Sequence, residues 1–370
     1  MKINLFAPFD PIQSGVVTYC EDLAQALEKR AVEVNRVNRA FWSSYRLGMP
    51  GVYQSPTLYL LDRALTLAVS PFYGLPRDSQ HAVNHFHVSG GYFNHLNVKH
   101  FWRVKGPRVI TVHDQNFVTP RIFSPYDETA QLAMLRQSDL VIVHTDELKH
   151  RLEFINPRME MIGHGVWPEQ FSIDPAEAKK RIGVRGTVVS QIGFMFNYKG
   201  IQNFIKAVSQ IEATVLIVGS GPDEAAIKKL ADYLCPGKID FRPYVPAAEF
   251  PYYVAASDIL VFPRSHSQGE CSGVLVQAMA AGKALIAHDI GCFKEYLGPE
   301  RGILVEPENI SDLRSAILTL LDDSELRTRY GQACKRYTQN YLGWDLIAEK
   351  HIALYEQLLT RRASLVANQV

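Results

Sequence analysis

The sequence predicts an α/β protein made of two Rossmann-like domains. Its 370 residues are enough for two domains, and 47% of them are hydrophobic, which provides both with a core. Short apolar runs alternate with helical stretches in two successive series, the pattern of parallel βα units. Gly and Ser follow several of these runs, at the strand ends where open α/β sheets bind ligands. We expect domains at 1–168 and 169–344, then a helix and tail at 345–370.

The first series begins with a strand at 3–7 and a helix at 16–30. Gly15 and Val16 lie at the N-terminus of that helix, where a Gly allows a ligand to approach the backbone closely. A plain tight turn explains the same residues. Later elements of this series are predicted as strands at 82–88, 108–113, 140–144 and 159–164, and as helices at 128–138 and 147–154.

Histidines gather at the carboxyl ends of two of these strands. His113 and Asp114 end one of them, and His85 and His87 lie in another. A histidine at a strand end is commonly a hydrogen-bonded structural residue, so both a structural and a functional role stay open. A metal site for the three histidines would need ligands from separate strands, and no short ligand spacing supports one.

Residues 41–80 are rich in aromatic residues, Pro and Gly. Their spacing indicates no chemistry. An acceptor-binding role is one hypothesis for this segment, and a packed surface excursion is the other.

The second series follows a polar, helical linker at 169–184. Its strands are predicted at 187–193, 213–218, 239–245, 259–262, 284–288 and 302–305, and its helices at 274–281, 310–322, 325–339 and 345–359. The Gly219-Ser-Gly221 turn is a poor dinucleotide fingerprint, because Glu224 occupies the position of the third Gly.

Two turns of this series suit a phosphate group. After the strand at 259–262, Ser272 is a plausible N-cap and Gly273 leaves the first N–H groups of the next helix accessible. Lys199 stands in another strand-to-helix turn, followed by Gly200. The plain alternatives are an ordinary strand–loop–helix step and a solvated lysine.

Composition excludes several classes of protein. A formal net charge of +1 gives no basis for bulk nucleic-acid binding. The five scattered cysteines form no C-x-x-C pair, which predicts a reducing compartment and no zinc site. The apolar run among the first residues is too short for a signal peptide. Asp62, Arg63 and Pro71 interrupt the most hydrophobic later segment, so we expect no transmembrane helix. We therefore expect a cytoplasmic protein that is peripheral to membranes at most.

The run from Pro263 to Lys283 resembles the nucleotide-sugar signature of the family 4 (group 1) glycosyltransferases. The Gly15 loop, the His113-Asp114 pair, the Lys199-Gly200 turn and the Tyr244-Val245-Pro246 segment are similar to other motifs of that family. The resemblance implies the GT-B fold, in which two Rossmann-like domains face a central cleft and the last helix crosses back to the first domain.

The sequence departs from the family pattern at two places. The family has two Glu residues separated by seven others; here Gln277 stands in the second place and Glu270 lies one position too close. Phe194 occupies a position where many members have Arg, and Arg264 is a possible substitute. The resemblance implies catalytic roles for Lys199, His113 and Glu270. It implies donor contacts for Gly15, Val16, Asp114, Arg264, Ser272, Gly273, Val274, Gln277, Tyr244 and Val245, the last two through the backbone.

The function so implied is a retaining hexosyltransferase of polysaccharide or glycoconjugate biosynthesis. It would move a sugar from a UDP- or GDP-sugar to a hydroxyl of a saccharide or glycolipid, without metal and with no cofactor besides the donor. No carboxylate pair at hydrolase spacing stands out, so we assign no covalent nucleophile. Two alternatives stay open: another nucleotide-sugar enzyme such as an epimerase, and a catalytically weak binding subunit.

Overall fold

The computed structural model describes residues 1–7, 15–38, 76, 78–88, 100–114, 124–267 and 269–367. They form two compact units. Unit 1 comprises Met1–Gly165, Gln268–Cys271 and Trp344–Val370, and unit 2 comprises Val166–Ser267 and Ser272–Gly343. Most of the aromatic segment at 41–80 lies outside the described residues, so the hypothesis of an acceptor role there is not addressed.

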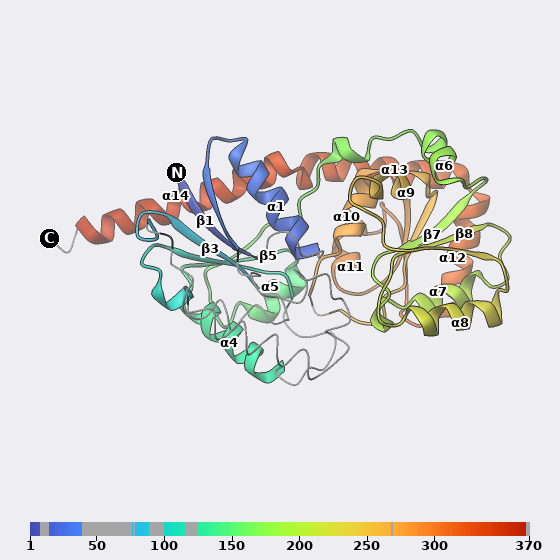
Figure 1. The fold of residues 1–370 in the computed structure, drawn as a ribbon, viewed down its shortest axis with the longest axis horizontal. Coiled ribbons are helices and arrows are strands. Elements are labelled where there is room, and N and C mark those ends of the chain that lie inside the picture. Colours follow the sequence, from blue (N-terminus) through green and yellow to red (C-terminus); the bar gives the residue numbers. More distant parts are fainter. Residues whose placement is uncertain are drawn as a thin grey trace. The chain divides into compact units, whose positions relative to one another are not determined.

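Unit 1 is built on a parallel sheet (Figure 1). Its six strands have the order β2-β1-β3-β4-β5-β6. Every residue of β3 and β5 is buried, as expected for central strands that are covered on both faces. The edge strand β2 was not predicted, because its sequence EVNRVN is mostly polar. The strands are β1 Lys2–Ala7, β2 Glu33–Asn38, β3 Val83–Val88, β4 Arg108–Val112, β5 Leu140–Val143 and β6 Met159–Met161.

The last helix of the chain belongs to unit 1, as the resemblance implied. It packs against α1 on the same side of the sheet (Figure 1). The side chains of Trp344 and Tyr355 are fully buried, and a Cβ on Gly165 would overlap the Trp344 indole. The described helices of this unit are α1 Gly15–Glu28, α4 Ser124–Gln137, α5 Asp146–Leu152 and α14 Trp344–Ala367.

Unit 2 holds a second parallel sheet (Figure 1). Its six strands have the order β12-β11-β10-β7-β8-β9. Every residue of β7, β10 and β11 is buried. The strands are β7 Val188–Ile192, β8 Thr214–Val218, β9 Ile239–Arg242, β10 Ile259–Phe262, β11 Ala284–His288 and β12 Ile303–Val305.

A continuous hydrophobic core joins one face of this sheet to α7, α8 and α12. The short elements of unit 2 are η3 Pro168–Phe171, α6 Pro175–Ile182, η4 Asn197–Lys199, α7 Ile201–Val208, α9 Phe250–Ala256, α10 Gly273–Ala280, α11 Cys292–Leu297 and a π-helical turn Thr338–Leu342; the longer ones are α8 Glu224–Leu234, α12 Ile310–Asp322 and α13 Ser324–Tyr337. Among the helices of the described residues, none has both the length and the apolar character needed to span a bilayer.

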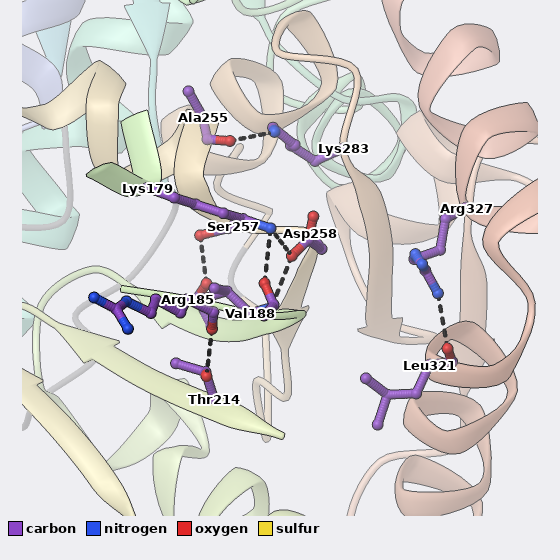
Figure 2. Close-up of polar contacts among 12 residues, drawn as sticks. Lys179, Arg185, Val188, Thr214, Ala255, Ser257, Asp258, Lys283, Leu321 and Arg327 are labelled. Atoms are coloured by element: carbon purple, nitrogen blue, oxygen red, sulfur yellow. Dashed lines mark hydrogen bonds and ion pairs between the residues drawn. The ribbon is translucent and has the colours of Figure 1, made fainter. Parts of the chain in front are cut away.

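Polar side chains organise the amino edge of the unit 2 sheet (Figure 2). The Asp258 carboxylate accepts from Lys179 Nζ at 2.7 Å and from the backbone N–H of Val188 at 2.7 Å. Lys283 Nζ donates to the carbonyl of Ala255, and burial lowers the pKa of this lysine to about 8. Because Lys283 directly precedes β11, it lies at the edge opposite to the strand ends that bind ligands in such sheets.

Candidate functional site

Two cations meet at the carboxyl edge of unit 2. Lys199 is the last residue of η4, after β7, and Arg264 is the second residue after β10. Lys199 Nζ lies 4.9 Å from the centroid of the Tyr198 ring, and Arg264 Cζ lies 5.5 Å from the same centroid. Both positive groups therefore occupy one corner of the sheet edge, which suits an anion.

The loops that carry these cations are packed directly on each other. Gly200 has φ 69°, and a Cβ at this position would overlap the carbonyl oxygen of Pro263. The backbone N–H of Ser265 donates to the carbonyl of Tyr198 at 2.9 Å. Glycine after Lys199 is thus required twice, by its left-handed backbone and by the close approach of the neighbouring loop.

Arg264 is held from two sides. Its side chain is 2% exposed, with Cζ 5.2 Å from the Phe293 ring centroid. His288, at the end of β11, donates from Nδ1 to the Arg264 carbonyl at 2.8 Å. Burial lowers the pKa of His288, which keeps its imidazole neutral near pH 7.

The start of α10 lies in the same unit, at the end of the loop that carries Arg264. Ser272 is the N-cap, and its hydroxyl accepts from the N–H of Leu275 at 3.4 Å. Val274 and Gln277 are both partly exposed, while Leu275, Val276 and Ala278 are buried. Residues three apart share a helix face, so Val274 and Gln277 mark the open face of this helix. The first N–H groups of α10 add positive partial charge to this edge.

An exposed aromatic pair stands beside the same loops. Phe194 and Tyr244 are 39% and 41% exposed, and their rings stack with centroids 6.3 Å apart and planes at 22°. The N–H of Tyr244 donates to Ser220 Oγ at 3.2 Å, so this backbone donor already has a protein partner. Val245 follows, partly exposed.

The other predicted site residues belong to unit 1. Gly15 is the exposed first residue of α1, with no atom within 4 Å of an added Cβ, and Val16 is partly exposed beside it. His113 and Asp114 directly follow β4. Glu270 lies in the Gln268–Cys271 segment of unit 1, whereas Ser272 begins the next segment of unit 2.

His113 is the centre of a buried chain of imidazoles in unit 1. Its Nε2 lies 3.0 Å from His87 Nδ1, and its Nδ1 lies 3.3 Å from His144 Nε2. His144 Nδ1 lies 2.9 Å from the carbonyl oxygen of Ile162. A carbonyl only accepts, so His144 Nδ1 must carry a proton and its Nε2 accepts from His113. The same reasoning makes His113 Nε2 the acceptor for His87.

These imidazoles are neutral in the folded protein. Burial, followed by the neighbouring histidines, lowers the pKa of His87 and His113 well below the usual value. Burial lowers the pKa of His144 to about 3 and that of His164 to about 4. Both ring nitrogens of His113 are engaged inside unit 1. A contact from His113 to a nucleotide-sugar donor would therefore come from its backbone, or its hydrogen bonds to the neighbouring imidazoles would have to break.

Several residues of these two regions were missed by the sequence analysis. Tyr198, His288 and His144 were assigned no role, although each contacts a predicted site residue. The signal for Tyr198 was an aromatic residue directly before Lys199-Gly200. No sequence signal joins His144 to His113, because only the pairing of β4 with β5 brings them together.

The predicted site residues thus form two groups, one in each unit. Lys199, Arg264, Ser272, Gly273, Val274, Gln277, Tyr244 and Val245 lie in unit 2, and Gly15, Val16, His113, Asp114 and Glu270 lie in unit 1. Two Rossmann-like units with ligand-suited loops after their strands constitute the GT-B fold, the fold class that the sequence predicted.

Comparison with known proteins shows which family unit 2 resembles. Residues 172–337, nearly all of unit 2, match the family model "Glycosyl transferases group 1". This segment is similar to the group 1 glycosyl transferases, as the signature run indicated.

Two solved structures share the fold over nearly the whole chain. Sucrose-phosphate synthase from Thermosynechococcus elongatus superposes with a TM-score of 0.78 at 20% identity, covering 97% of this chain and 99% of that one. Anabaena HepE, solved in complex with UDP, gives 0.72 at 16% identity, covering 96% and 100%. At these identities the likeness establishes the fold.

Relatives identified by sequence match over part of their length. An uncharacterized glycosyltransferase of Methanocaldococcus jannaschii is 25% identical over 251 residues, 63% of this chain and 62% of the relative. Between 55% and 62% of the length of the first three such relatives is matched.

Proposed function

We propose that the chain is a glycosyltransferase that moves a sugar from a nucleotide-diphosphate donor to a hydroxyl of a saccharide or glycolipid, with retention of configuration. The observation that carries the proposal is the corner where Lys199 and Arg264 share the Tyr198 ring, in the same sheet edge as the start of α10. Two cations and helix N–H groups form a site for the diphosphate.

The role of this corner is to stabilise the negative charge that develops on the departing diphosphate. The bond between the sugar C1 and the diphosphate oxygen breaks, and the electron pair stays on the departing diphosphate. Lys199 and Arg264 neutralise this charge as it develops, which lowers the barrier because the interaction is stronger in the transition state. The acceptor oxygen bonds to C1 on the same face, and its proton passes to a departing phosphate oxygen. Unit 1 would carry the acceptor.

The stacked pair Phe194 and Tyr244 supports a nucleotide donor. Exposed aromatic faces at a ligand edge offer stacking to a base, and a face of this kind does not distinguish uracil from guanine by itself. The UDP complex of the structurally similar HepE favours uridine as the first base to test. The five free cysteines are consistent with a reducing compartment, for which we propose the cytoplasm.

The test is a thermal-shift screen of the full chain against UDP, GDP, ADP and their sugars, followed by a transfer assay with the sugar that binds. A ligand that binds only the folded protein raises its melting temperature. We expect one nucleotide diphosphate and its sugar to shift the transition, and the sugar to be consumed only when an acceptor is present. Binding by none of them would contradict the proposal. Conversion of the donor to an isomer without acceptor would favour an epimerase.

We further propose that the donor diphosphate needs no divalent metal. Lys199 and Arg264 supply the positive charge that a Mg²⁺ or Mn²⁺ ion provides in other sites. Donor binding and transfer should therefore persist in excess EDTA. Loss of donor binding in EDTA with recovery on adding Mn²⁺ would overturn this part of the proposal.

A further inference from the structure

We propose that Cys20, His87 and His113 form a buried site in unit 1 for a borderline transition metal, with Zn²⁺ as the first candidate. One ligand atom from each residue can be chosen so that all three lie within 4.8 Å of one another, and all three side chains are buried. The site belongs to unit 1, whereas the proposed diphosphate corner belongs to unit 2, and it does not depend on the proposed function.

The three ligands come from three elements that the fold brings together. Cys20 lies on α1, His87 on β3, and His113 directly after β4. β3 and β4 are neighbouring parallel strands, in a register that pairs His87 with Thr111. This explains why the sequence shows no short ligand spacing: the site is assembled by strand pairing and helix packing.

The donor set selects the class of metal. One thiol and two imidazoles suit Zn²⁺, Co²⁺ or Cu⁺, whereas Mg²⁺ and Ca²⁺ prefer oxygen ligands. Tetrahedral zinc holds such ligands roughly 3.3–3.6 Å apart, from bonds of about 2.0 Å to nitrogen and about 2.3 Å to sulfur. The 3.0 Å between His87 Nδ1 and His113 Nε2 is already close to that range. All three ligand atoms lie within 4.8 Å of one another, so completing the set requires them to approach by at most roughly 1.5 Å.

The surroundings of His113 match those of a metal ligand. Ligating histidines usually donate their second ring N–H to a fixed acceptor, which sets the tautomer. Here His113 Nδ1 donates to His144, which the carbonyl of Ile162 orients, so the Nε2 lone pair of His113 points toward His87. A metal would replace the proton between these two nitrogens, with the displaced proton moving to His87 Nε2 by exchange and the Cys20 thiol losing its proton to solvent.

A second observation comes from the residue beside Cys20. Tyr19 is 1% exposed, its hydroxyl has no hydrogen-bond partner among the described residues, and its ring centroid lies 4.9 Å from that of His113. A buried hydroxyl without a partner is costly. Water bound at the fourth position of the metal is one group that could satisfy it.

The experiment measures metal in the full chain, purified without chelator or affinity metal. We expect about one equivalent of zinc per chain by inductively coupled plasma mass spectrometry. After exchange into Co²⁺ we expect a thiolate-to-cobalt charge-transfer band in the near ultraviolet. Neither readout requires activity. A folded wild-type chain that holds no zinc and gives no such band with Co²⁺ would overturn the proposal.

Variants then assign the site. Cys20→Ala should lower bound zinc at least tenfold and abolish the cobalt band. The matched control is Cys235→Ala, which removes another buried thiol, in unit 2, and should leave both unchanged. Zinc retained by Cys20→Ala would contradict the assignment. If Cys20→Ala fails to fold, His87→Asn provides the same test, and the wild-type measurements decide in either case.

Discussion

Lys199 is the residue on which the proposed chemistry depends most. Its Nζ and the Arg264 guanidinium approach one aromatic ring, and Phe194 brings no charge to the turn where the family resemblance implies an Arg. The two cations therefore carry the side-chain charge of this corner between them.

Lys199→Met keeps most of the side-chain stem and removes the charge. We expect kcat to fall by roughly 10²–10³, the loss typical when one preorganised stabilising group is deleted. The loss should appear in kcat and kcat/KM together, because the contact strengthens in the transition state. Steady-state kinetics with the donor found in the screen measure it.

The control for this variant is Lys206→Met, which removes an exposed lysine from α7 in the same unit. It should leave both constants unchanged, and neither variant should shift the melting temperature appreciably. Near-normal turnover of Lys199→Met would show that Arg264 or the N–H groups of α10 carry the charge instead.

Gln277 and Glu270 are the second residue-scale question, because they replace the usual acidic pair. Gln277 lies on the open face of α10, so Gln277→Glu should be tolerated, with donor affinity changed by less than about tenfold, or ~1.4 kcal/mol. Glu270→Ala should reduce transfer while leaving the affinity for free nucleotide nearly intact. Isothermal titration with nucleotide and with nucleotide sugar separates the two. Equal loss of both affinities in Glu270→Ala would assign this residue to nucleotide binding or to folding.

At the scale of elements, the turn from η4 into α7 shows how backbone geometry holds the site. Gly200 ends η4 and caps α7 in a left-handed conformation, against the loop that carries Arg264. The position of Lys199 therefore depends on a residue without a side chain.

Gly200→Ala tests this dependence. A left-handed Ala costs roughly 1–2 kcal/mol, and the overlap of its Cβ with the Pro263 carbonyl adds to that cost. The matched control is Gly183→Ala, where φ is 76° and nothing lies within 4 Å of an added Cβ. Denaturant unfolding should show the larger loss of stability for Gly200→Ala. Equal losses would mean that the two loops separate easily.

At the scale of the whole molecule, the two ends of the chain are joined in one unit. α14 closes unit 1 by burying Trp344, His351 and Tyr355. The hydroxyl of Tyr355 lies 2.6 Å from His85 Nδ1, on β3. The buried histidines of this unit make its stability depend on pH.

Acid should destabilise unit 1 before the carboxylates titrate. Burial lowers the pKa of His351 and of His164 to about 4, from 6.5 for an unperturbed histidine. Between these values the unfolded chain binds more protons than the folded chain. Stability is therefore full above pH 6.5 and falls as the pH decreases toward 4, by on the order of 3 kcal/mol for each histidine. Urea unfolding at a series of pH values measures this dependence.

His351→Gln should flatten that dependence, because the glutamine does not titrate. His150→Gln, which changes an exposed histidine on α5, is the control and should leave the slope unchanged. A slope that is identical in all three proteins would show that His351 titrates alike in the folded and the unfolded chain, contrary to the lowered pKa.

The sequence by itself determined the two βα series, the GT-B class and the helix starts after Lys199 and Ser272; the phosphate role of these turns stays a prediction. These features are local: a buried parallel strand is an uninterrupted apolar run, and a capped helix start is read from adjacent residues. The polar edge strand β2 was not predicted, because it lacks such a local signal. Pairing with β1, rather than its own composition, makes it a strand.

Only the tertiary structure decided which distant residues meet. Tyr198 joins Lys199 to Arg264 because β7 and β10 are neighbours in the sheet. Cys20, His87 and His113 come together because β3 pairs with β4 and Tyr19 of α1 contacts both histidines, whereas the sequence, lacking any short spacing, indicated no metal site. The order of the strands is set by how completely helices cover both faces of each sheet. This depends on the whole chain and cannot be read from any one segment.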